Sequence, residues 1–557
     1  MSQDIMHRYI TDGLNALNEM EEASRRGAAW SRESLQQLLL ENADTEYGRK
    51  HHFAQISSYE DFVREVPLSD YSDYEPYIRR MLENNEKNLI TAHDVNYYCH
   101  TSGTTGAPKM IPKTREDLGI FFRYAYQSMF GLCDRTCREA GKKGMPDCKG
   151  LLIAESRIQK NAQGVSIGAL SESIFFPEDT AGYNILPPDL IYTTYDFDRR
   201  HLKMLYALRE RHLSFMMGTF SPLLYDMLQY VQYSCELLCS DIETGRINAE
   251  ITIDPRLREK LEREMRPDPE RAEEIRRIMK DHTDGAFVPL LWPDMQMVAA
   301  IGSSVFQPAT EKLRTMLGPD IMFHFLSYSC SEMTIAVEIN PDDPTYMLLP
   351  FGGFCEFLPV EGNETGTPLL MDQLEIGKEY EVIITNLSGF YRYRLGDVIR
   401  VTGFHNECPM VVVSYRKSQL ANLHGEKISE EVFQKAIDEL SQETGTAILE
   451  YSVCPDTDAV PDRYIVLLEA DRIITPDRWQ RYSDVLEEKL CRMHDSYRDK
   501  IQQKTLAPLD VRFVEPQTYA LYRDMKIMSG ASPNQIKPVR VITDNRLRDF
   551  FFGLLQD

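Results

Sequence analysis

The segment HTSGTTGAPK at residues 100–109 carries the strongest signal in this 557-residue sequence. Gly103 and Gly106 allow backbone conformations that other residues avoid, so the loop can approach a ligand closely. Hydroxyl side chains and successive main-chain N–H groups can surround an anion, and a lysine adds positive charge. An ordinary surface loop is the alternative for such a run. The specific string favours a phosphate site made by Thr101, Ser102, Gly103, Thr104, Thr105, Gly106 and Lys109.

This loop differs from the G-x-x-x-x-G-K-[ST] type of nucleotide loop. Lys109 does not directly follow Gly106, and no hydroxyl residue follows Lys109. The predicted phosphate site is therefore not a loop of that type.

Around the loop, short apolar runs alternate with longer helical patterns. This alternation is typical of a layered α/β architecture. The strand candidates lie at 151–154, 215–218, 297–301, 321–328 and 380–385. The stretch YRYRLGDVIRV at 391–401 resembles a strand that enters a turn and leaves as a second strand.

Two further stretches have a helical character. Residues 1–27 predict an amphipathic helix, and residues 254–284 predict two solvent-facing charged helices joined at Pro267 and Pro269. Acidic residues are interleaved throughout 254–284, which argues against a nucleic-acid surface there.

The composition becomes polar at 414–428, SYRKSQLANLHGEKI, which indicates a domain boundary. We predict a larger N-terminal α/β domain at 1–414, with mixed sheets flanked by helices. A smaller, mobile α+β domain is predicted at 415–557, with the hinge near 415–428.

Charge and apolar patterning limit the partners. The sequence has 62 basic and 86 acidic residues, and its net charge of −24 disfavours binding to nucleic acid or to anionic lipid. No apolar run approaches the ~20 residues that cross a bilayer, and the N-terminus lacks the pattern of a secretory signal. The 11 scattered cysteines lack zinc-site spacing, so we expect reduced thiols in a cytoplasmic protein. No heptad pattern indicates a particular oligomeric state.

The string TSGTTG-x-P-K resembles the signature loop of adenylate-forming enzymes, which activate a carboxylate as an acyl-AMP. That pattern implies an aromatic residue shortly before an acidic one, as in Tyr328-Ser-Cys-Ser-Glu332. By this resemblance, Tyr328 lies against the adenine of ATP and Glu332 reaches Mg²⁺. Aromatic faces stack on bases, and hard cations prefer carboxylate oxygen. Without this resemblance, Tyr328 would be interpreted as a residue at the edge of the core and Glu332 as a charged surface residue.

The same pattern implies an aspartate after a glycine near the end of a strand. Gly396-Asp397 occupies this place, and its carboxylate is suited to accept hydrogen bonds from two ribose hydroxyls. A simple turn is the alternative, because Gly-Asp is common in turns.

Longer matches point to a narrower group. The segments at 389–406 (GFYRYRLGDVIRVTGFHN), 354–361 (FCEFLPVE) and 530–540 (GASPNQIKPVR) resemble Gretchen-Hagen-type acyl acid-amido synthetases, and the resemblance covers nearly the whole chain. The family is best known for plant enzymes that join hormone acids to amino acids. The resemblance implies that ATP and a carboxylic acid give an acyl-adenylate and pyrophosphate. An amino acid's amine then attacks to give an amide and AMP.

Two lysines follow from this resemblance. Lys427, just past the hinge, matches a phosphate-contacting lysine, and Lys537 matches a lysine that reaches the reacting carboxylate at the α-phosphate. With Glu332 they form the predicted catalytic set, because cations stabilise the charge that develops there. His100 and Ile536 depart from the residues usual in the family and suggest a divergent branch.

The acid is expected to lie near residues 121–132 and 215–228. Phe122, Arg123, Tyr126 and Met217 are the candidates for its pocket. Aromatic and Met residues at helical spacing also suit ordinary core packing, and Arg123 could pair with an acidic neighbour instead.

Two other functions compete with amide formation. An acid–coenzyme A ligase would share the loop, Tyr328, Glu332, Asp397 and Lys537. A nucleotide-binding module without catalysis is disfavoured because the charged positions are all present. For the enzyme we expect the small domain to rotate near Arg416 and Lys417 between the two half-reactions.

Overall fold

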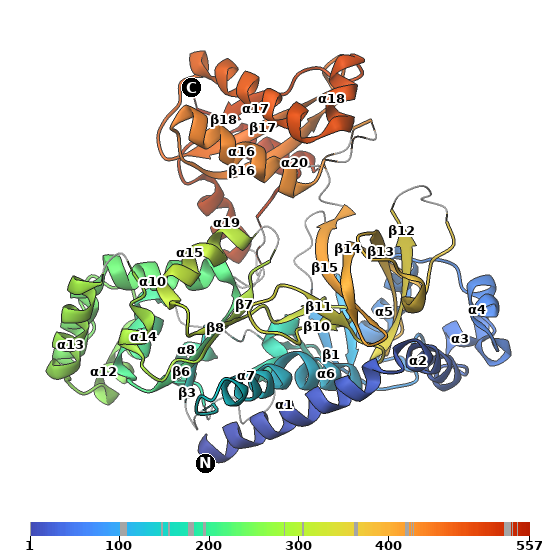
Figure 1. The fold of residues 1–557 in the computed structure, drawn as a ribbon, viewed down its shortest axis with the longest axis horizontal. Coiled ribbons are helices and arrows are strands. Elements are labelled where there is room, and N and C mark those ends of the chain that lie inside the picture. Colours follow the sequence, from blue (N-terminus) through green and yellow to red (C-terminus); the bar gives the residue numbers. More distant parts are fainter. Residues whose placement is uncertain are drawn as a thin grey trace. The chain divides into compact units, whose positions relative to one another are not determined.

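The computed structural model describes residues 2–100, 109–145, 149–153, 156, 158–175, 183–192, 197–282, 285–303, 306–360, 366–417, 421, 423–424, 426, 428–528, 536, 538–542 and 544–556. The chain divides into two compact units (Figure 1). The larger unit comprises 1–101, 110–395 and 399–413, and the smaller comprises 102–109, 396–398 and 414–557. Both combine helices with sheets, which confirms the predicted α/β class.

A parallel four-stranded sheet lies in the larger unit. Its strands, in the order β3-β6-β7-β8, are β3 (Lys149–Leu152), β6 (Leu213–Phe220), β7 (Met297–Ile301) and β8 (Met322–His324). Crossover helices follow its strands in the chain, among them α10 (Ser221–Tyr233) and α15 (Gln307–Leu317). Strands covered on both faces need apolar residues throughout, which explains the runs that predicted them.

A seven-stranded sheet follows, in the order β12-β13-β14-β15-β11-β10-β9. Its strands are β9 (Ser327–Ser329), β10 (Thr334–Val337), β11 (Tyr346–Leu348), β12 (Gly353–Pro359), β13 (Glu379–Asn386), β14 (Tyr393–His405) and β15 (Cys408–Arg416). The predicted turn within 391–401 is wrong, because β14 runs through it as one strand. Gly396 takes φ +80° there, so glycine lets the backbone bend without ending the strand.

The third sheet of this unit has the order β2-β1-β5-β4. It contains β1 (Val95–His100), β2 (Met110–Thr114), β4 (Gln159–Lys160) and β5 (Ser166–Gly168). β1 and β2 pair antiparallel, with His100 opposite Met110, so they bring the two ends of the predicted phosphate loop together. Short helices α2 (Gly27–Glu41), α3 (Glu46–Lys50), α4 (Tyr59–Glu65) and α5 (Tyr71–Asn84) precede this sheet.

The predicted N-terminal helix is α1 (Ser2–Ser24), and its buried face carries apolar residues such as Tyr9 and Leu17. It packs on a π-helix, η2 (Phe121–Gln127), and on α7 (Ser128–Glu139), which lie beside it in Figure 1. The helices approach closely at Gly13 and Gly131. A Cβ at Gly13 would lie 2.2 Å from the main-chain oxygen of Gln127.

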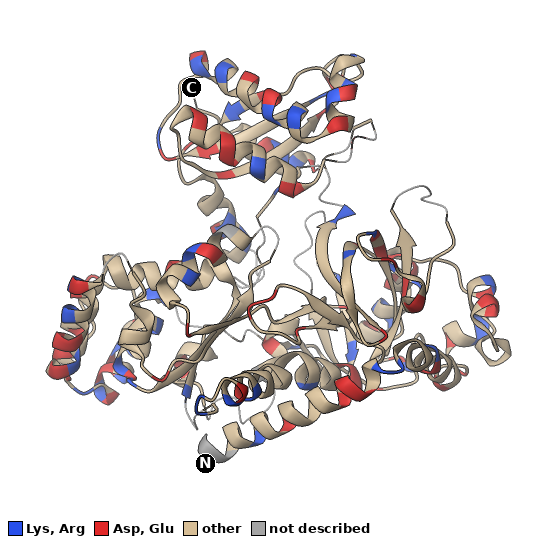
Figure 2. Ribbon diagram, viewed as in Figure 1, with Lys and Arg blue, Asp and Glu red and all other residues tan. Residues whose placement is uncertain are grey.

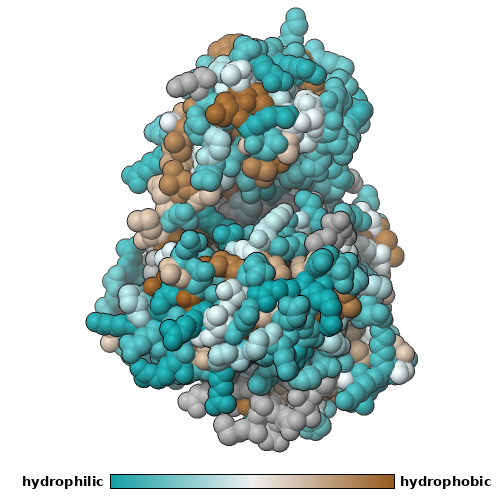
Figure 3. All heavy atoms as spheres, turned by 90° about the vertical axis from the view of Figure 1, so that its left-hand side faces the viewer, coloured by the Kyte–Doolittle hydropathy of each residue, from teal (hydrophilic) through white to brown (hydrophobic). Residues whose placement is uncertain are grey.

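The charged stretch 254–284 forms α12 (Pro255–Glu264) and α13 (Pro269–Asp281), as predicted. Figure 2 shows acidic and basic residues mixed along both helices. Elsewhere, Figure 3 shows a face dominated by hydrophilic residues, with hydrophobic ones in small separate groups. Among the helices that the structure describes, none is long and apolar enough to cross a membrane.

The smaller unit has its own core. A three-stranded sheet, β16 (Ile448–Asp456), β17 (Arg463–Ala470) and β18 (Asp510–Phe513), packs with helices. These are α16 (Glu430–Thr444), α17 (Trp479–Met493), α18 (Asp495–Gln502), α19 (Thr518–Met528) and α20 (Asn545–Phe552).

The contact of α1 with α7 is testable through Gly131. We expect Gly131→Ala to destabilise the larger unit by about 1–3 kcal/mol, because its new Cβ would lie 2.4 Å from the main-chain carbon of Gly13. Gly119→Ala is the control, since a Cβ at that exposed helical position has no atom within 4 Å. Thermal unfolding should show a lower Tm for the first variant only, and equal Tm values would contradict this account.

Candidate active site

Several predicted site residues lie outside the described residues. They are the loop positions 101–106 and the two lysines, Lys427 and Lys537. Their predicted roles therefore stay predictions. The described site residues are Lys109, Tyr328, Glu332, Asp397 and the four candidates for the acid pocket.

Tyr328 and Glu332 lie at the edge of the seven-stranded sheet. Tyr328 is in β9 opposite Ala336 of β10, and Glu332 lies in the turn that joins these strands. The main-chain N–H of Cys330 donates to the oxygen of Met333 at 3.0 Å and closes the turn. Both predicted residues are only 7% exposed, so this short turn brings them together at a buried position.

The Glu332 carboxylate has an unusual environment for a buried acid. The Tyr393 hydroxyl, from β14, donates to its Oε1 at 3.4 Å. Among the residues that the structure describes, no lysine or arginine forms an ion pair with this carboxylate. Buried carboxylates normally pair with a cation or bind a metal, so the donor set suits a hard cation such as Mg²⁺.

The main chain of Glu332 is held as well. Lys113 Nζ donates to its carbonyl oxygen at 3.1 Å, and Asn386 Nδ2 donates to the same oxygen at 2.8 Å. Neither residue was predicted from the sequence, and Tyr393 was quoted only as part of a motif. One signal was available for Lys113, because a lysine inside the strand pattern MIPKT is unusual.

Asp397 follows Gly396 in β14, where the positive φ of the glycine sets the direction of the strand. The Asp397 Oδ1 accepts a hydrogen bond from Arg416 Nε at 2.5 Å. The aspartate is 7% exposed, and the arginine side chain is 36% exposed. The carboxylate predicted to hold ribose thus contacts an arginine of the predicted hinge.

The acid-pocket candidates separate into different surroundings. Phe122 and Tyr126 lie on η2 with ring centroids 5.6 Å apart, and Tyr126 shares a hydrogen bond with Tyr183. Arg123 forms an ion pair with Glu19 of α1 at 2.5 Å. Pairing with an acidic neighbour was the predicted alternative to a place in the acid pocket. Met217 lies in β6 and is 8% exposed. Functional sites often contain a π-helix, so η2 is consistent with the predicted acid pocket, which stays a prediction.

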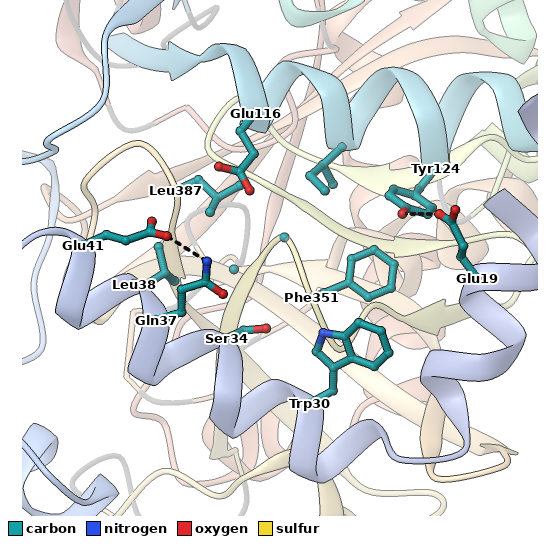
Figure 4. Close-up of a pocket in the computed structure, with 13 residues that line it drawn as sticks. Glu19, Trp30, Ser34, Gln37, Leu38, Glu41, Glu116, Tyr124, Phe351 and Leu387 are labelled. Carbon is teal, nitrogen blue, oxygen red and sulfur yellow. Dashed lines mark hydrogen bonds between the residues drawn. The ribbon is translucent and has the colours of Figure 1, made fainter. Parts of the chain in front are cut away.

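A cavity of about 320 Å³ opens elsewhere in the larger unit (Figure 4). Its walls come from α1, α2, α6 (Arg115–Ile120), Tyr124 of η2, the segment 351–353 and Leu387. None of the predicted site residues lines it. The cavity combines aromatic and acidic residues: Glu19, Trp30, Glu41, Glu116, Tyr124 and Phe351.

In the smaller unit, Glu426 holds the turn that immediately precedes Lys427. Its carboxylate accepts hydrogen bonds from the main-chain N–H groups of Leu423 and His424, at 2.7 and 2.8 Å, and from the Tyr464 hydroxyl. Burial by itself would raise the pKa of Glu426, but these hydrogen bonds lower it below its usual value. Sequence analysis did not single out Glu426.

Comparison with known proteins identifies the family. The GH3 family N-terminal domain matches residues 16–322, the central domain matches 346–416, and the C-terminal domain matches 431–546. This chain belongs to the GH3 family. The resemblance to Gretchen-Hagen-type synthetases is thereby confirmed. Tyr328, Glu332 and Lys427 fall between the matched segments, whereas Asp397 and Lys537 fall within them.

Curated GH3 relatives span the same length. The indole-3-acetic acid-amido synthetase GH3.4 of Arabidopsis thaliana is 26% identical, covering 95% of this chain and 92% of its own. The jasmonoyl–L-amino acid synthetase GH3.5 of Oryza sativa subsp. japonica is also 26% identical, covering 94% of each chain. The solved structure of the GH3.15 acyl acid amido synthetase has a TM-score of 0.81 at 24% identity, covering 97% of this chain and 96% of that one. The adenylate-forming type of fold predicted from the sequence is thus a GH3 fold.

The Glu426 contacts give a prediction with a pH dependence. Glu426→Gln should destabilise the smaller unit by on the order of 2 kcal/mol at pH 7, because an amide cannot replace a carboxylate that accepts several N–H and O–H groups. The folded pKa is lowered, so this stabilisation is present above the ordinary glutamate pKa of about 4.3 and is lost as the pH falls through the folded value. The gap between variant and wild type should therefore close in acid.

Urea unfolding at neutral and acidic pH, with amide hydrogen exchange at Leu423 and His424, measures both effects. The matched control is Glu431→Gln, since Glu431 is exposed and pairs only with Lys435 among the described residues. A constant gap at every pH would show that the charge of Glu426 does not matter.

Proposed function

We propose that this chain is an ATP-dependent ligase that joins a carboxylic acid to the amine of an amino acid and acts in the cytoplasm. The acid oxygen attacks the α-phosphorus of ATP, giving acyl-AMP and pyrophosphate. The amine then attacks the acyl carbon, and the C–O bond to AMP breaks. The products are an amide and AMP, with ATP consumed as a substrate.

The observation that carries the proposal is the family match along almost the full chain, combined with an acidic site where the adenylation pattern requires one. The relatives named above are an indole-3-acetic acid-amido synthetase and a jasmonoyl–L-amino acid synthetase. At 26% identity the acid itself can differ, because one methylene in an apolar pocket changes binding by only about 1–3 kcal/mol. The proposal therefore names the classes of acid and amine.

The nucleotide would lie along the seven-stranded sheet and the loop at 101–109. Tyr328 would lie against the adenine, and the loop with Lys109 would surround the phosphates. Asp397 would accept hydrogen bonds from the ribose hydroxyls in place of its contact with Arg416. The acid would lie near Phe122, Arg123, Tyr126 and Met217.

Glu332 would hold Mg²⁺, and its surroundings suit that role. The carboxylate is buried, accepts a long hydrogen bond from Tyr393 and has no cationic partner among the described residues. Bound Mg²⁺ would neutralise phosphate charge as pyrophosphate leaves. Tyr393 would orient the carboxylate before the ion arrives.

The two lysines would act at different moments. Lys537 would stabilise the negative charge that develops when the carboxylate attacks, and Lys427 would contact phosphate. We propose that the smaller unit rotates near Arg416 and Lys417 between adenylation and aminolysis. Such rotation would move Lys537 away from the reacting carboxylate after adenylation. It would also exclude water from the adenylate.

Pyrophosphate release tests the proposal. We expect the purified chain with MgATP to release pyrophosphate in the presence of some members of a panel of aromatic, fatty and hormone-like acids. Glu332→Gln and Lys537→Ala should each lower that rate by about 100-fold or more, as expected for removal of one electrostatic contact to the reacting phosphate. Glu431→Gln, an exposed acid, should retain it.

Mass spectrometry after addition of mixed amino acids identifies the product. An acyl-amino acid supports the ligase. A product formed only with coenzyme A would replace it by the thioester-forming alternative. ATP binding without pyrophosphate release for any acid would favour the module without catalysis.

A further inference from the structure

A buried lysine lies beside the predicted metal residue. Lys113, in β2, is 1% exposed, and its Nζ donates to Asp117 Oδ2 at 2.9 Å and to the Glu332 carbonyl oxygen at 3.1 Å. Lys113 thus forms a buried ion pair with Asp117 while it donates to the main chain of Glu332.

The same carbonyl has a second donor whose orientation is determined by its neighbours. Asn386 Nδ2 donates to it at 2.8 Å, while Asn386 Oδ1 accepts from the main-chain N–H groups of Ser388 at 3.0 Å and Phe390 at 2.9 Å. Because the amide oxygen must face these two N–H groups, its nitrogen must face Glu332. Both acceptor sites of the Glu332 carbonyl are thus occupied.

The lysine is itself held in place. Asp117 Oδ2 also accepts a hydrogen bond from the Ser388 hydroxyl at 2.6 Å, and the Asp117 main-chain N–H donates to Thr114 Oγ1 at 3.2 Å. Thr114 thereby caps the start of α6, and the Asp117 carboxylate joins Lys113 of β2 to Ser388 in the β13–β14 turn. The Glu332 carbonyl is tied to residues 219 and 54 positions away in the chain.

This arrangement is costly for a purely structural contact. Burying a lysine and an aspartate removes both charges from water, and an apolar pair of similar volume is often as stable. A neutral hydrogen-bond donor in place of Lys113 would be enough to satisfy the Glu332 carbonyl oxygen. The loss of stability is explained if the reaction requires Glu332 at a fixed position, because catalytic geometry tolerates only small displacements.

We propose that Lys113 and Asn386 are positioning residues that hold the main chain of Glu332, so that its carboxylate keeps one direction toward MgATP. The clamp, meaning Lys113, Asp117, Ser388 and Asn386, does not touch the substrate. It rests on the proposed function, since it acts only if Glu332 holds the metal. It adds a determinant of metal affinity outside the adenylation motifs.

Two variants test the clamp, and the first of them leaves no unpaired charge. Lys113→Met combined with Asp117→Asn removes both charges together. Asn386→Asp keeps the oxygen that accepts from Ser388 and Phe390 but replaces the donor that faces Glu332. If the double variant fails to fold, the single variant still decides the question.

The matched control is Arg271→Met. Arg271 of α13 is also a 1% exposed cation, and it donates to the carbonyl oxygens of Leu208 at 2.8 Å and Leu291 at 2.7 Å and to the Glu274 carboxylate. It is thus a buried cation with the same kind of acceptors, but it does not contact Glu332. Its loss should lower Tm without changing metal binding.

Binding of Mn²⁺, measured by electron paramagnetic resonance in the presence of ATP and without acid, is the main readout. We expect both clamp variants to weaken Mn²⁺ binding at least tenfold, and we expect the same of Glu332→Gln. Arg271→Met should keep the wild-type Mn²⁺ affinity. In turnover, the half-saturating Mg²⁺ concentration should rise and kcat fall, with KM for the acid within twofold. Added Mg²⁺ should restore part of the rate.

Wild-type Mn²⁺ affinity in both clamp variants, or an equal loss in Arg271→Met, would overturn the positioning role while leaving the proposed function intact. Unchanged Mn²⁺ binding in Glu332→Gln would overturn the metal role of Glu332 and, with it, the clamp. The two failures are therefore distinguishable in one set of titrations.

Discussion

The turn between β13 and β14 is the constraint on which the predicted metal residue depends. Asn386, at the end of β13, holds the main chain of Glu332, and Tyr393, at the start of β14, donates to its carboxylate. Gly389 in this turn has φ +104°, and a Cβ there would lie 2.7 Å from the oxygen of Ile90. Only glycine allows this close approach, so the turn fixes Glu332 from two sides.

A second buried pair supports the same turn from outside the site. Arg392, also at positive φ, directs its guanidinium to Glu356 of β12 and to the oxygen of Val66. In addition, the main-chain N–H of Ser69 donates to the oxygen of Arg392 at 3.0 Å. These contacts tie the segment before α5 to the sheet, because a buried guanidinium needs several acceptors at once. Tyr393 directly follows Arg392 in the chain. The contacts of Arg392 with Glu356 and Val66 therefore help to determine where the Tyr393 hydroxyl points.

The sequence predicted those parts whose signal is local. The apolar runs at 215–218 and 297–301 became buried parallel strands, and the Tyr328–Glu332 spacing became a short turn between two strands. The clamp was beyond such reasoning, because Lys113 of one sheet meets Glu332 and Asn386 of the seven-stranded sheet only after both sheets have assembled. The stretch 391–401 was misread for a related reason. Gly396-Asp397 suits a turn locally, but pairing with neighbouring strands keeps β14 continuous through it.

The contact between Asp397 and Arg416 joins the residue predicted to bind ribose to the predicted hinge. Both residues belong to the smaller unit, Asp397 in β14 and Arg416 at the end of β15. The arginine side chain is partly exposed, whereas the aspartate is buried. Ribose hydroxyls that donate to this carboxylate, as proposed, would satisfy it in place of the guanidinium and leave Arg416 to move with the hinge. By contrast, the Lys113–Asp117 pair is buried, and removing one partner would leave an uncompensated charge. The molecule thus places a partly exposed ion pair where motion is proposed and a fully buried one where the proposed clamp holds Glu332.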